Sequence, residues 1–393
     1  MKYGKPLLNK IRLRRGKFRI LFFNRWVGLH IGGTETHIKE LAWRLAKRGH
    51  EVHILTTRGN KLKKYEKSVK IWYVAQNPGE PPFSRSISAD GKLLIYALVF
   101  AVQSLLKLLI LRLKGIEFDV ISVHCTLETF LMRLVRRVFG TPYVFIFEGF
   151  THMEAKVAKH ANLQIAISQD IVNKCLTNYG YKPTLIPIGV NKNWINTNAS
   201  EIREKHAKNG EKLVLTVCRL DARKDIPTLI SAADIVRQKD PKIKFLVIGD
   251  GVEREKLQKQ IETLKLSNTV KIIREMPVSP SYFKACDIFA LPSLYEGFGI
   301  VFLEAMSAGL PIISTTAPAI PEVVGDAGIL IPPRKPEVLA EKILQVAKDD
   351  ELRKELIDRG LRRVEKYDWD KLITKYEKAY KSVIYHHKSK AKT

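Results

Sequence analysis

The chain has 393 residues, 45% of them hydrophobic, which suits two domains with cores of their own and excludes a wholly disordered protein. Its 67 Lys and Arg residues outnumber 40 Asp and Glu residues, and the formal net charge of +27 favours anionic partners. The four cysteines have neither metal-binding nor disulfide spacing, which indicates buried thiols in a reducing compartment.

The positive charge favours phosphorylated ligands or an anionic membrane surface, and the membrane surface is the first candidate. No nucleic acid partner is expected, because the chain has no RNA-binding signature and its basic residues are not interleaved with aromatic ones. Abundant Lys, Glu and Ile residues are also typical of a heat-adapted protein.

Residues 1–17 form a predicted basic N-terminal tail, which has no acidic residue and has apolar residues between its Lys and Arg residues. Such a segment either lies on anionic lipid or is a disordered tail. No signal peptide is expected, since no apolar segment with a small-residue cleavage site follows. We therefore expect a cytoplasmic protein, either soluble or peripheral on the cytoplasmic membrane face.

A strand, a glycine loop and a helix open the first predicted domain. The apolar run 18–23 predicts the strand, the loop contains Gly32 and Gly33, and apolar residues at helical spacing predict a helix over 35–47. A double glycine before a helix is weak support for ligand binding by itself. On this helix, His37 is more typical of a partly exposed residue than of a catalyst.

The most apolar stretch of the chain is residues 93–113, which follow a predicted loop over 77–88. The stretch is long enough to span a bilayer, but Lys107 and Arg112 interrupt it and a strand follows at once. We favour a buried crossover helix. The alternative is a helix partly dipped into the membrane beside a lipid acceptor, and a true span is least favoured.

Two polar residues follow predicted strands of the first half. His124 follows the strand over 118–123, and Glu148 follows the strand over 143–147. Ligands of open α/β sheets bind beyond the carboxyl ends of the strands, so His124 lies where chemistry would occur. A carboxylate at position 148 can accept a proton from a hydroxyl group or bind it. For His124, a hydrogen bond within its turn is an almost equal alternative.

The second half begins after a polar predicted linker over 192–211. A strand over 213–217 is followed by Arg219 and Lys224, near the start of a helix. A guanidinium can grip two phosphate oxygens and an ammonium adds a point charge, although solvated surface cations are the commoner case. A later Gly-Asp-Gly sequence, at 249–251, lacks the third glycine of a dinucleotide fingerprint and argues against NAD.

The most informative stretch is residues 295–315, in which a glycine loop carries Glu296 and a helix over 300–308 carries Glu304. The amides of a first helical turn are unpaired and lie at the positive end of the dipole, which favours a phosphate. Eight residues separate the two glutamates, about two helical turns, so both can face one cleft.

The string EGFGIVFLEAMSAGLP, at residues 296–311, resembles the signature of the retaining nucleotide-sugar glycosyltransferases of family 4, which have the GT-B fold. Four further regions resemble the same family in the expected order, and the resemblance covers roughly residues 18–383. They are GGTETHIKELAWRLAKRGHEVHILT at 32–56, the strand-and-serine element at 163–168, PIGVN at 187–191 and CRLDARKDIPTLISAA at 218–233.

The resemblance implies roles for particular residues. It implies that Glu296 binds the sugar, that Glu304 binds the ribose hydroxyls, and that Gly33, Arg219 and Lys224 stabilise the leaving diphosphate. The remaining donor-binding residues would be Gly297, Phe298, Gly299 and Ile300, and the catalytic residues would be Glu296, His124 and Glu148.

Several positions depart from the family pattern, among them Ile188 and Asn191 in the PIGVN turn. Glu148 stands where many members have a histidine near the reacting sugar, and Cys218 replaces a glycine. Residues 317–319 read Ala-Pro-Ala where members often have a glycine pair, so the backbone there is expected to approach the ligand less closely.

We therefore predict an α/β protein with two Rossmann-like domains whose parallel sheets face each other across a cleft. The domains are 18–191, joined by a returning helix at 369–387, and 212–368, with a frayed tail at 388–393. The resemblance implies a retaining transferase that moves a hexosyl unit from a UDP- or GDP-sugar to a glycan or lipid-linked acceptor, without metal or other cofactor. The alternative is a catalytically impaired protein of this fold that binds anions or a membrane surface.

Overall fold

The computed structural model describes most of the chain. It covers residues 16–27, 32–58, 62, 67–74, 91–124, 126–192, 196–208, 210–275 and 278–390, with the backbone alone at 91–98, 126–130 and 390. The predicted loop over 77–88, Cys125, and nearly all of the predicted basic tail lie outside the described residues.

The first sheet has, among the described residues, seven parallel strands in the order β3-β2-β1-β4-β5-β6-β7. They are β1 (Arg19–Phe23), β2 (Glu51–Thr56), β3 (Lys70–Tyr73), β4 (Val120–Val123), β5 (Tyr143–Phe147), β6 (Leu163–Ala166) and β7 (Thr184–Leu185). The central strands are almost wholly buried because helices cover both faces of the sheet, which is why their sequences are continuously apolar. The helices of this half are α1 (Gly33–Lys47), α2 (Gly91–Leu113), α3 (Thr126–Phe139), α4 (His152–Ala158) and α5 (Gln169–Tyr179).

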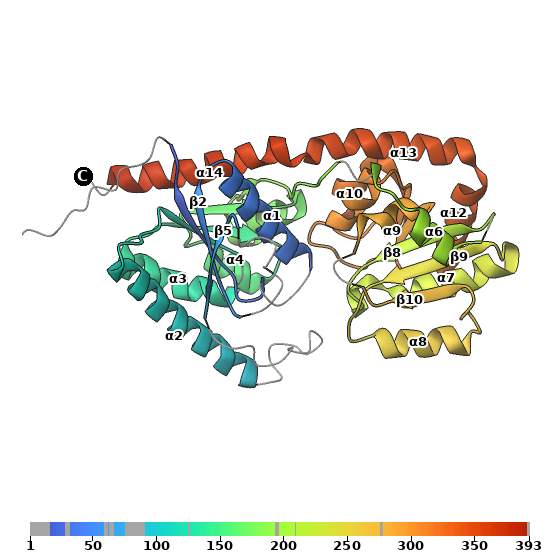
Figure 1. The fold of residues 1–393 in the computed structure, drawn as a ribbon, viewed down its shortest axis with the longest axis horizontal. Helices are drawn as coiled ribbons and strands as arrows, with labels where there is room; N and C mark the ends of the chain where they lie inside the picture. The colour runs from blue at the N-terminus through green and yellow to red at the C-terminus, as the bar shows by residue number, and fades with distance from the viewer. Residues whose placement is uncertain are drawn as a thin grey trace, which may run out of the picture.

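The second sheet has, in the part of the chain that is described, six parallel strands in the order β10-β9-β8-β11-β12-β13. They are β8 (Lys212–Val217), β9 (Ile243–Ile248), β10 (Val270–Ile273), β11 (Ile288–Leu291), β12 (Ile312–Thr315) and β13 (Gly328–Ile331). Its helices include α6 (Ser200–His206), the short η3 (Ala222–Lys224), α7 (Ile226–Lys239), α8 (Arg254–Thr263), α9 (Pro280–Ala285), α10 (Ile300–Ser307), α11 (Ile320–Val324), α12 (Pro336–Lys348) and α13 (Asp350–Val364). The predicted fold class is thus confirmed, with two parallel sheets side by side along the long axis of the molecule (Figure 1).

Each sheet has one point at which its strand order reverses, between β1 and β4 in the first and between β8 and β11 in the second. Open α/β sheets bind ligands beyond the carboxyl ends of the strands at such a point. The Gly32-Gly33 pair and His124 follow β1 and β4, and Arg219 and Glu296 follow β8 and β11. The topology therefore gathers the predicted site residues at the reversal points of the two sheets.

The terminal helix α14 (Trp369–Lys390) returns from the second half and lies along the first (Figure 1). The Tyr376 hydroxyl donates to the carbonyl of Ile186 at 3.0 Å, and the Lys388 ammonium pairs with Asp119 at 2.9 Å. The helix thereby ties the two halves together.

Three local predictions are corrected by the described residues. Lys388 to Lys390 are helical rather than frayed, because α14 continues over the first sheet. The predicted irregular linker contains a helix, α6. The helix over 91–113 packs only one side into the core, since Leu113 is 80% exposed and Leu108 only 5%. No helix among the described residues is both long and apolar enough to cross a bilayer.

Candidate functional site

The loop that carries Glu296 is held at the end of β11 by a glycine and by hydroxyl groups. Gly299 has a φ of 89°, a left-handed conformation that favours glycine, and it begins α10 without a side-chain cap. The Ser314 hydroxyl donates to the carbonyl of Leu291 at 2.7 Å and fixes the neighbouring strand end. The Phe302 amide donates to the Gly299 carbonyl at 3.0 Å, and because α10 has no side-chain cap, its other first-turn amides are available to a ligand.

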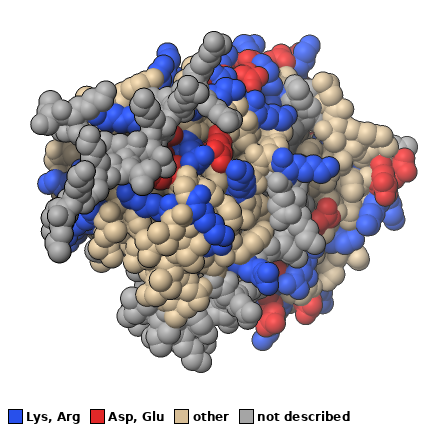
Figure 2. All heavy atoms as spheres, turned by 60° about the vertical axis from the view of Figure 1, so that its left-hand side comes forward, with Lys and Arg blue, Asp and Glu red and all other residues tan. Residues whose placement is uncertain are grey.

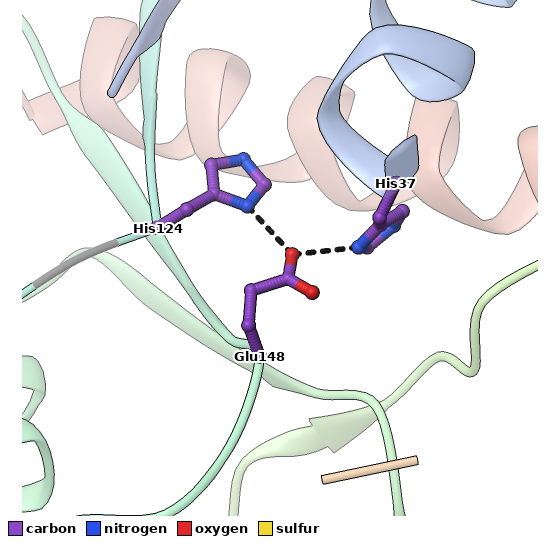
Figure 3. A group of neighbouring side chains, drawn as sticks. All are labelled: His37, His124 and Glu148. Atoms are coloured by element: carbon purple, nitrogen blue, oxygen red, sulfur yellow. Dashed lines mark hydrogen bonds and ion pairs between the residues drawn. The ribbon is translucent and has the colours of Figure 1, made fainter. Parts of the chain in front are cut away.

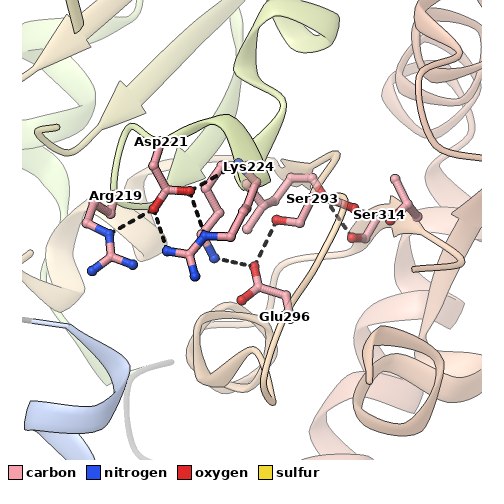
Figure 4. Close-up of polar contacts among 9 residues, drawn as sticks. Arg219, Asp221, Lys224, Ser293, Glu296 and Ser314 are labelled. Atoms are coloured by element: carbon pink, nitrogen blue, oxygen red, sulfur yellow. Dashed lines mark hydrogen bonds and ion pairs between the residues drawn. The ribbon is translucent and has the colours of Figure 1, made fainter. Parts of the chain in front are cut away.

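Glu296 is bound by a cation from a distant part of the chain. Its Oε1 accepts from the Lys224 ammonium at 2.6 Å and from the Ser293 hydroxyl at 2.8 Å, as Figure 4 shows. The two loops are joined as well by the Leu294 amide, which donates to the carbonyl of Arg223 at 2.7 Å. Glu296 is only 8% exposed, so the Lys224–Glu296 pair is a largely desolvated ion pair.

Arg219 is oriented by a carboxylate that the sequence did not single out. Asp221 accepts from Arg219 Nε at 2.9 Å and from an Arg223 terminal nitrogen at 2.8 Å (Figure 4). Burial alone would raise the pKa of Asp221, but the hydrogen bonds from Arg223 and Arg219 outweigh it and lower that pKa to about 2. Asp221 is therefore ionised at neutral pH and fixes the Arg219 guanidinium beside the Lys224–Glu296 pair.

Glu304 lies one turn inside α10 and faces the first half. Burial, together with the nearby Glu40 carboxylate of α1, raises the pKa of its carboxyl to about 7. A carboxyl group with this pKa is about half protonated at neutral pH. Bound hydroxyl groups that donate to Glu304 would favour its ionised form.

Small residues let the two halves meet. A Cβ on Gly297 would lie 2.4 Å from the Glu148 carbonyl oxygen, whereas a Cβ on Gly33 would lie 3.8 Å from Ile300 Cγ2, an ordinary contact. The Tyr295 hydroxyl accepts from the Phe150 amide at 3.2 Å. The glycine loop of the second half thus rests directly on the end of β5, above Glu148.

Glu148 is the centre of a buried polar cluster, which Figure 3 shows converging from α1 and from the ends of β4 and β5. Its Oε1 lies 2.6 Å from His37 Nδ1 and 2.8 Å from His124 Nδ1. A carboxylate can only accept, so both imidazoles donate from Nδ1. His124 Nε2 then accepts from the Ser122 hydroxyl at 3.0 Å, and Ser122 accepts from Tyr380 of α14 at 2.9 Å.

The electrostatics of this cluster favour an ionised Glu148 beside a neutral His124 ring. Burial would raise the pKa of Glu148, but the two histidines outweigh it and lower that pKa. Burial lowers the pKa of His124, even though Glu148 acts in the opposite direction. Two buried polar atoms, Glu148 Oε2 and His37 Nε2, have no hydrogen-bond partner, so the cluster retains an acceptor and a ring nitrogen for a ligand.

The same three residues form the one group of His, Cys, Asp and Glu ligands among the described residues that is close enough to hold a metal ion. Both Nδ1 atoms already donate to the carboxylate, and a metal would have to displace those protons. The absence of a required metal or cofactor stays a prediction.

Sequence comparison assigns both halves of the chain. Residues 31–194 match the family described as Glycosyltransferase Family 4, and residues 198–363 match the family described as Glycosyl transferases group 1. Together the two matches cover most of the chain. The chain belongs to the GT-B glycosyltransferases of family 4.

Individual relatives are similar to this glycosyltransferase over different lengths. The O-antigen chain mannosyltransferase B of Escherichia coli is 29% identical over 46% of this chain, and the match spans only 48% of that protein. The alpha-monoglucosyldiacylglycerol synthase of Streptococcus pneumoniae is 26% identical over 80% of this chain and 74% of that protein. The crystal structure of Anabaena HepE with UDP and glucose has the same fold, with a TM-score of 0.77, 21% identity, and coverage of 93% of this chain and 100% of that chain.

The structure brings most of the predicted site residues of this glycosyltransferase to the facing edges of the two sheets. Glu296 and Lys224 touch, Arg219 is held beside them, and Gly297 rests on Glu148. Phe298 differs in that it is only 2% exposed and stacks edge-on against Tyr367, so its side chain belongs to the core and only its backbone can serve a ligand.

Sequence reasoning missed His37 and Asp221. The expectation of a partly exposed His37 was wrong, because its side chain is fully buried against Trp369 and Tyr376 of α14 and bound to Glu148. A signal existed, since His37 follows Gly33 by four residues, one helical turn from the ligand edge of the sheet.

The Ala-Pro-Ala sequence at 317–319 leads into α11, and the expected distance of its backbone from the ligand stays a prediction. Ala319 has a φ of 67°, in the left-handed region that glycine favours, and it begins α11. The backbone therefore takes a glycine-like path without a glycine there, at a cost of about 1–2 kcal/mol.

Proposed function

We propose that this glycosyltransferase moves a hexosyl unit from a UDP- or GDP-sugar to a hydroxyl group of a glycan or lipid-linked acceptor, with retention of the anomeric configuration. The proposal rests on one arrangement above all. The desolvated Lys224–Glu296 pair and the uncapped start of α10 lie where the second half meets Gly33 and Glu148 of the first. Cations and unpaired amides suit a diphosphate, and the carboxylates suit sugar hydroxyls.

In the proposed reaction the acceptor oxygen bonds to the anomeric carbon on the side from which the diphosphate departs. The bond from that carbon to the phosphate oxygen breaks, and the acceptor proton passes to a departing phosphate oxygen. Arg219, Lys224 and the backbone at Gly33 would stabilise the charge that develops on the diphosphate. Glu296 would bind the sugar, and Glu304 the ribose hydroxyls. Glu148 and His124 would face the acceptor hydroxyl.

The names of similar proteins support the donor and acceptor classes. The S. pneumoniae relative makes a glycolipid, and the Anabaena structure holds UDP and glucose. The net charge of +27 suits an anionic membrane surface. We therefore place the protein in the cytoplasm, with a peripheral site at the cytoplasmic membrane face as its place of action.

A panel of UDP- and GDP-sugars tests the proposal directly. Calorimetry identifies the donor that binds, release of UDP or GDP measures its turnover, and the anomeric configuration of the product is read by NMR. Turnover in the presence of EDTA is expected, because cations of the chain would neutralise the diphosphate. Binding without any cleavage would favour the impaired, anion-binding alternative, and no binding of any donor would overturn the proposal.

Gly33→Ala is expected to weaken UDP binding by about tenfold, because the methyl group would fill space that the diphosphate needs. The fold has room for this methyl group, whose nearest neighbour would be Ile300 at 3.8 Å. The thermal midpoint should therefore stay level or rise slightly, since alanine favours a helix more than glycine does. Calorimetry and thermal unfolding measure the two quantities. Unchanged UDP affinity would place the diphosphate elsewhere.

The pKa of about 7 at Glu304 predicts a pH dependence of donor binding. Hydroxyl groups that donate to Glu304 need its ionised form, so donor affinity should rise between pH 6 and pH 8, with a loss of about tenfold per unit below the pKa. The variant Glu304→Gln should bind donor weakly at every pH in this range. A wild-type affinity that does not vary with pH would contradict the role of Glu304.

The same group affects stability with the opposite sign. Between its ordinary pKa of 4.5 and about 7, folded Glu304 holds a proton that the unfolded chain releases, so the free energy of unfolding should fall as pH rises through this window. In the variant Glu304→Gln, the free energy of unfolding, measured by chemical denaturation, should therefore depend less on pH in this window.

A further inference from the structure

The outer side of α2 carries a row of exposed apolar side chains, with one exposed polar residue, Gln103, among them. They repeat at helical spacing and are each between 41 and 80% exposed: Val99, Val102, Leu106, Leu109, Ile110 and Leu113. At about 1.5 Å per residue the row is about 21 Å long. On α3, which contacts α2, Leu134 and Val138 are also exposed, and Val138 is 60% exposed. We call these eight residues the α2–α3 face.

This face is not the consequence of a loosely packed helix. The inner side of α2 is closely packed, with Phe100, Leu108 and Leu111 each at most 5% exposed. Folding of the described chain therefore fixes α2 firmly and leaves its other side in water. Soluble monomeric proteins seldom expose a large contiguous apolar patch, and such patches mark interaction sites.

Cations border the face. Arg136 and Arg137 on α3 and Lys114 after α2 are exposed, and Arg112 is held at the edge by its hydrogen bond to the carbonyl of Phe139 at 3.0 Å. The 23 residues of α2 contain no Asp or Glu. Among the described side chains, the Glu117 carboxylate lies 3.5 Å from Arg112. Figure 2 shows this half of the molecule, with broad uncharged surface between Lys and Arg side chains.

We infer that the α2–α3 face lies on an anionic lipid bilayer, with its apolar side chains below the headgroups and its cations among them. An apolar stripe bordered by Lys and Arg is the composition that binds the interface of such a membrane. A second copy of the chain is a poorer partner, because two such borders would bring cations against cations.

The position of the face suits the proposed acceptor. In a parallel sheet, each helix begins near the carboxyl ends of the strands, which is the ligand edge, and returns to the opposite edge. The helix α2 therefore begins at the ligand edge and leads into β4. The strand β4 ends at His124, and α3 begins just after it. A membrane along α2 would therefore reach the side of the molecule on which His124 and Glu148 lie. This part of the inference rests on the proposed function, whereas membrane binding by the face stands apart from it.

Flotation tests the inference with the full chain and vesicles made of equal parts phosphatidylglycerol and phosphatidylcholine, beside vesicles of phosphatidylcholine alone. The wild-type protein should float with the anionic vesicles at low salt. The double variant Val102→Gln, Leu106→Gln should lower the bound fraction by about tenfold or more, because it removes two apolar groups from the interface. Arg136→Glu, Arg137→Glu should lower it as well, and most strongly at low salt.

Leu176→Gln is the matched control, since Leu176 is 49% exposed on α5 and lies outside the face. It should float like the wild type. All four proteins should bind UDP equally in the absence of vesicles, and their thermal midpoints show that they are folded. A wild-type chain that stays in solution would overturn the inference. Light scattering gives a second contrary outcome. If the wild type is a dimer and the Val102→Gln, Leu106→Gln variant is a monomer, the face binds a second copy of the chain and the inference is overturned.

These readouts separate the inference from the proposed function. Cleavage of a nucleotide-sugar without vesicle binding would leave the transferase standing and remove the membrane face. Vesicle binding without any donor binding would support the membrane face and overturn the proposed transferase activity.

Discussion

Replacing Lys224 with alanine is expected to lower the rate of sugar transfer by about 10²- to 10³-fold, because the departing diphosphate would lose a preorganised cation. The change also leaves Glu296 without its charge partner. That carboxylate would keep only the Ser293 hydroxyl in a site that is 8% exposed, so we expect a loss of about 2 kcal/mol in the free energy of unfolding. Steady-state kinetics and chemical denaturation measure the two effects.

The double variant Lys224→Met, Glu296→Gln separates catalysis from stability. It removes both charges, so much of the lost stability should return, while sugar transfer should remain as low as in the single variant. Lys70→Ala is the control, because Lys70 pairs with Glu51 at 2.7 Å at the opposite, amino edge of the first sheet. A double variant that regains activity would show that the pair is only structural.

Glu148→Gln is expected to lower kcat by about 10²-fold or more while UDP affinity stays the same, because the change removes the charge that would face the acceptor hydroxyl. The amide oxygen can still accept from His37 and His124, so the cluster can keep its shape. Its thermal midpoint should fall, since the carboxylate is held ionised between two buried rings. Single-turnover kinetics with the identified donor measures the effect.

The pH dependence of stability provides a second readout for this cluster. The pKa of His124 is lowered on folding, so the folded chain resists a proton that the unfolded chain binds below about pH 6.5. Stability should therefore fall as pH decreases below that value, and His124→Gln should weaken the fall.

Glu51→Gln is the control for Glu148→Gln, because Glu51 accepts from the buried His53 at 3.1 Å far from the cleft. Equal losses of kcat in both variants would contradict a role at the acceptor.

Much of the fold follows from local pattern. Strands such as β5, with the sequence YVFIF, are apolar throughout because both faces of a parallel sheet are covered, and this is visible in a few consecutive residues. The loop with Glu296 and Gly299 likewise predicts the start of α10 from a few consecutive residues. In the same way, Arg219 and Lys224 predict two cations after β8. Family membership then follows from the order of these elements.

Other features depend on residues that are far apart in the chain. His37 and Glu148 are 111 positions apart, and Lys224 and Glu296 are 72 apart. Their contacts arise because strand-order reversals bring separate loops to one edge, and no local spacing encodes this. The raised pKa of Glu304 likewise depends on its burial and then on Glu40, which approaches only when the two halves meet.

By itself, then, the sequence determined the α/β alternation, the two parallel sheets and the residue types of a diphosphate site, because periodicity and turn chemistry act over a few residues. Only the tertiary structure decided which side of α2 enters the core and which side remains in water. The few polar residues of α2, such as Lys107 and Arg112, do not form a polar face that would mark its outside, so burial at Leu108 and exposure at Leu106 follow from where the first sheet lies.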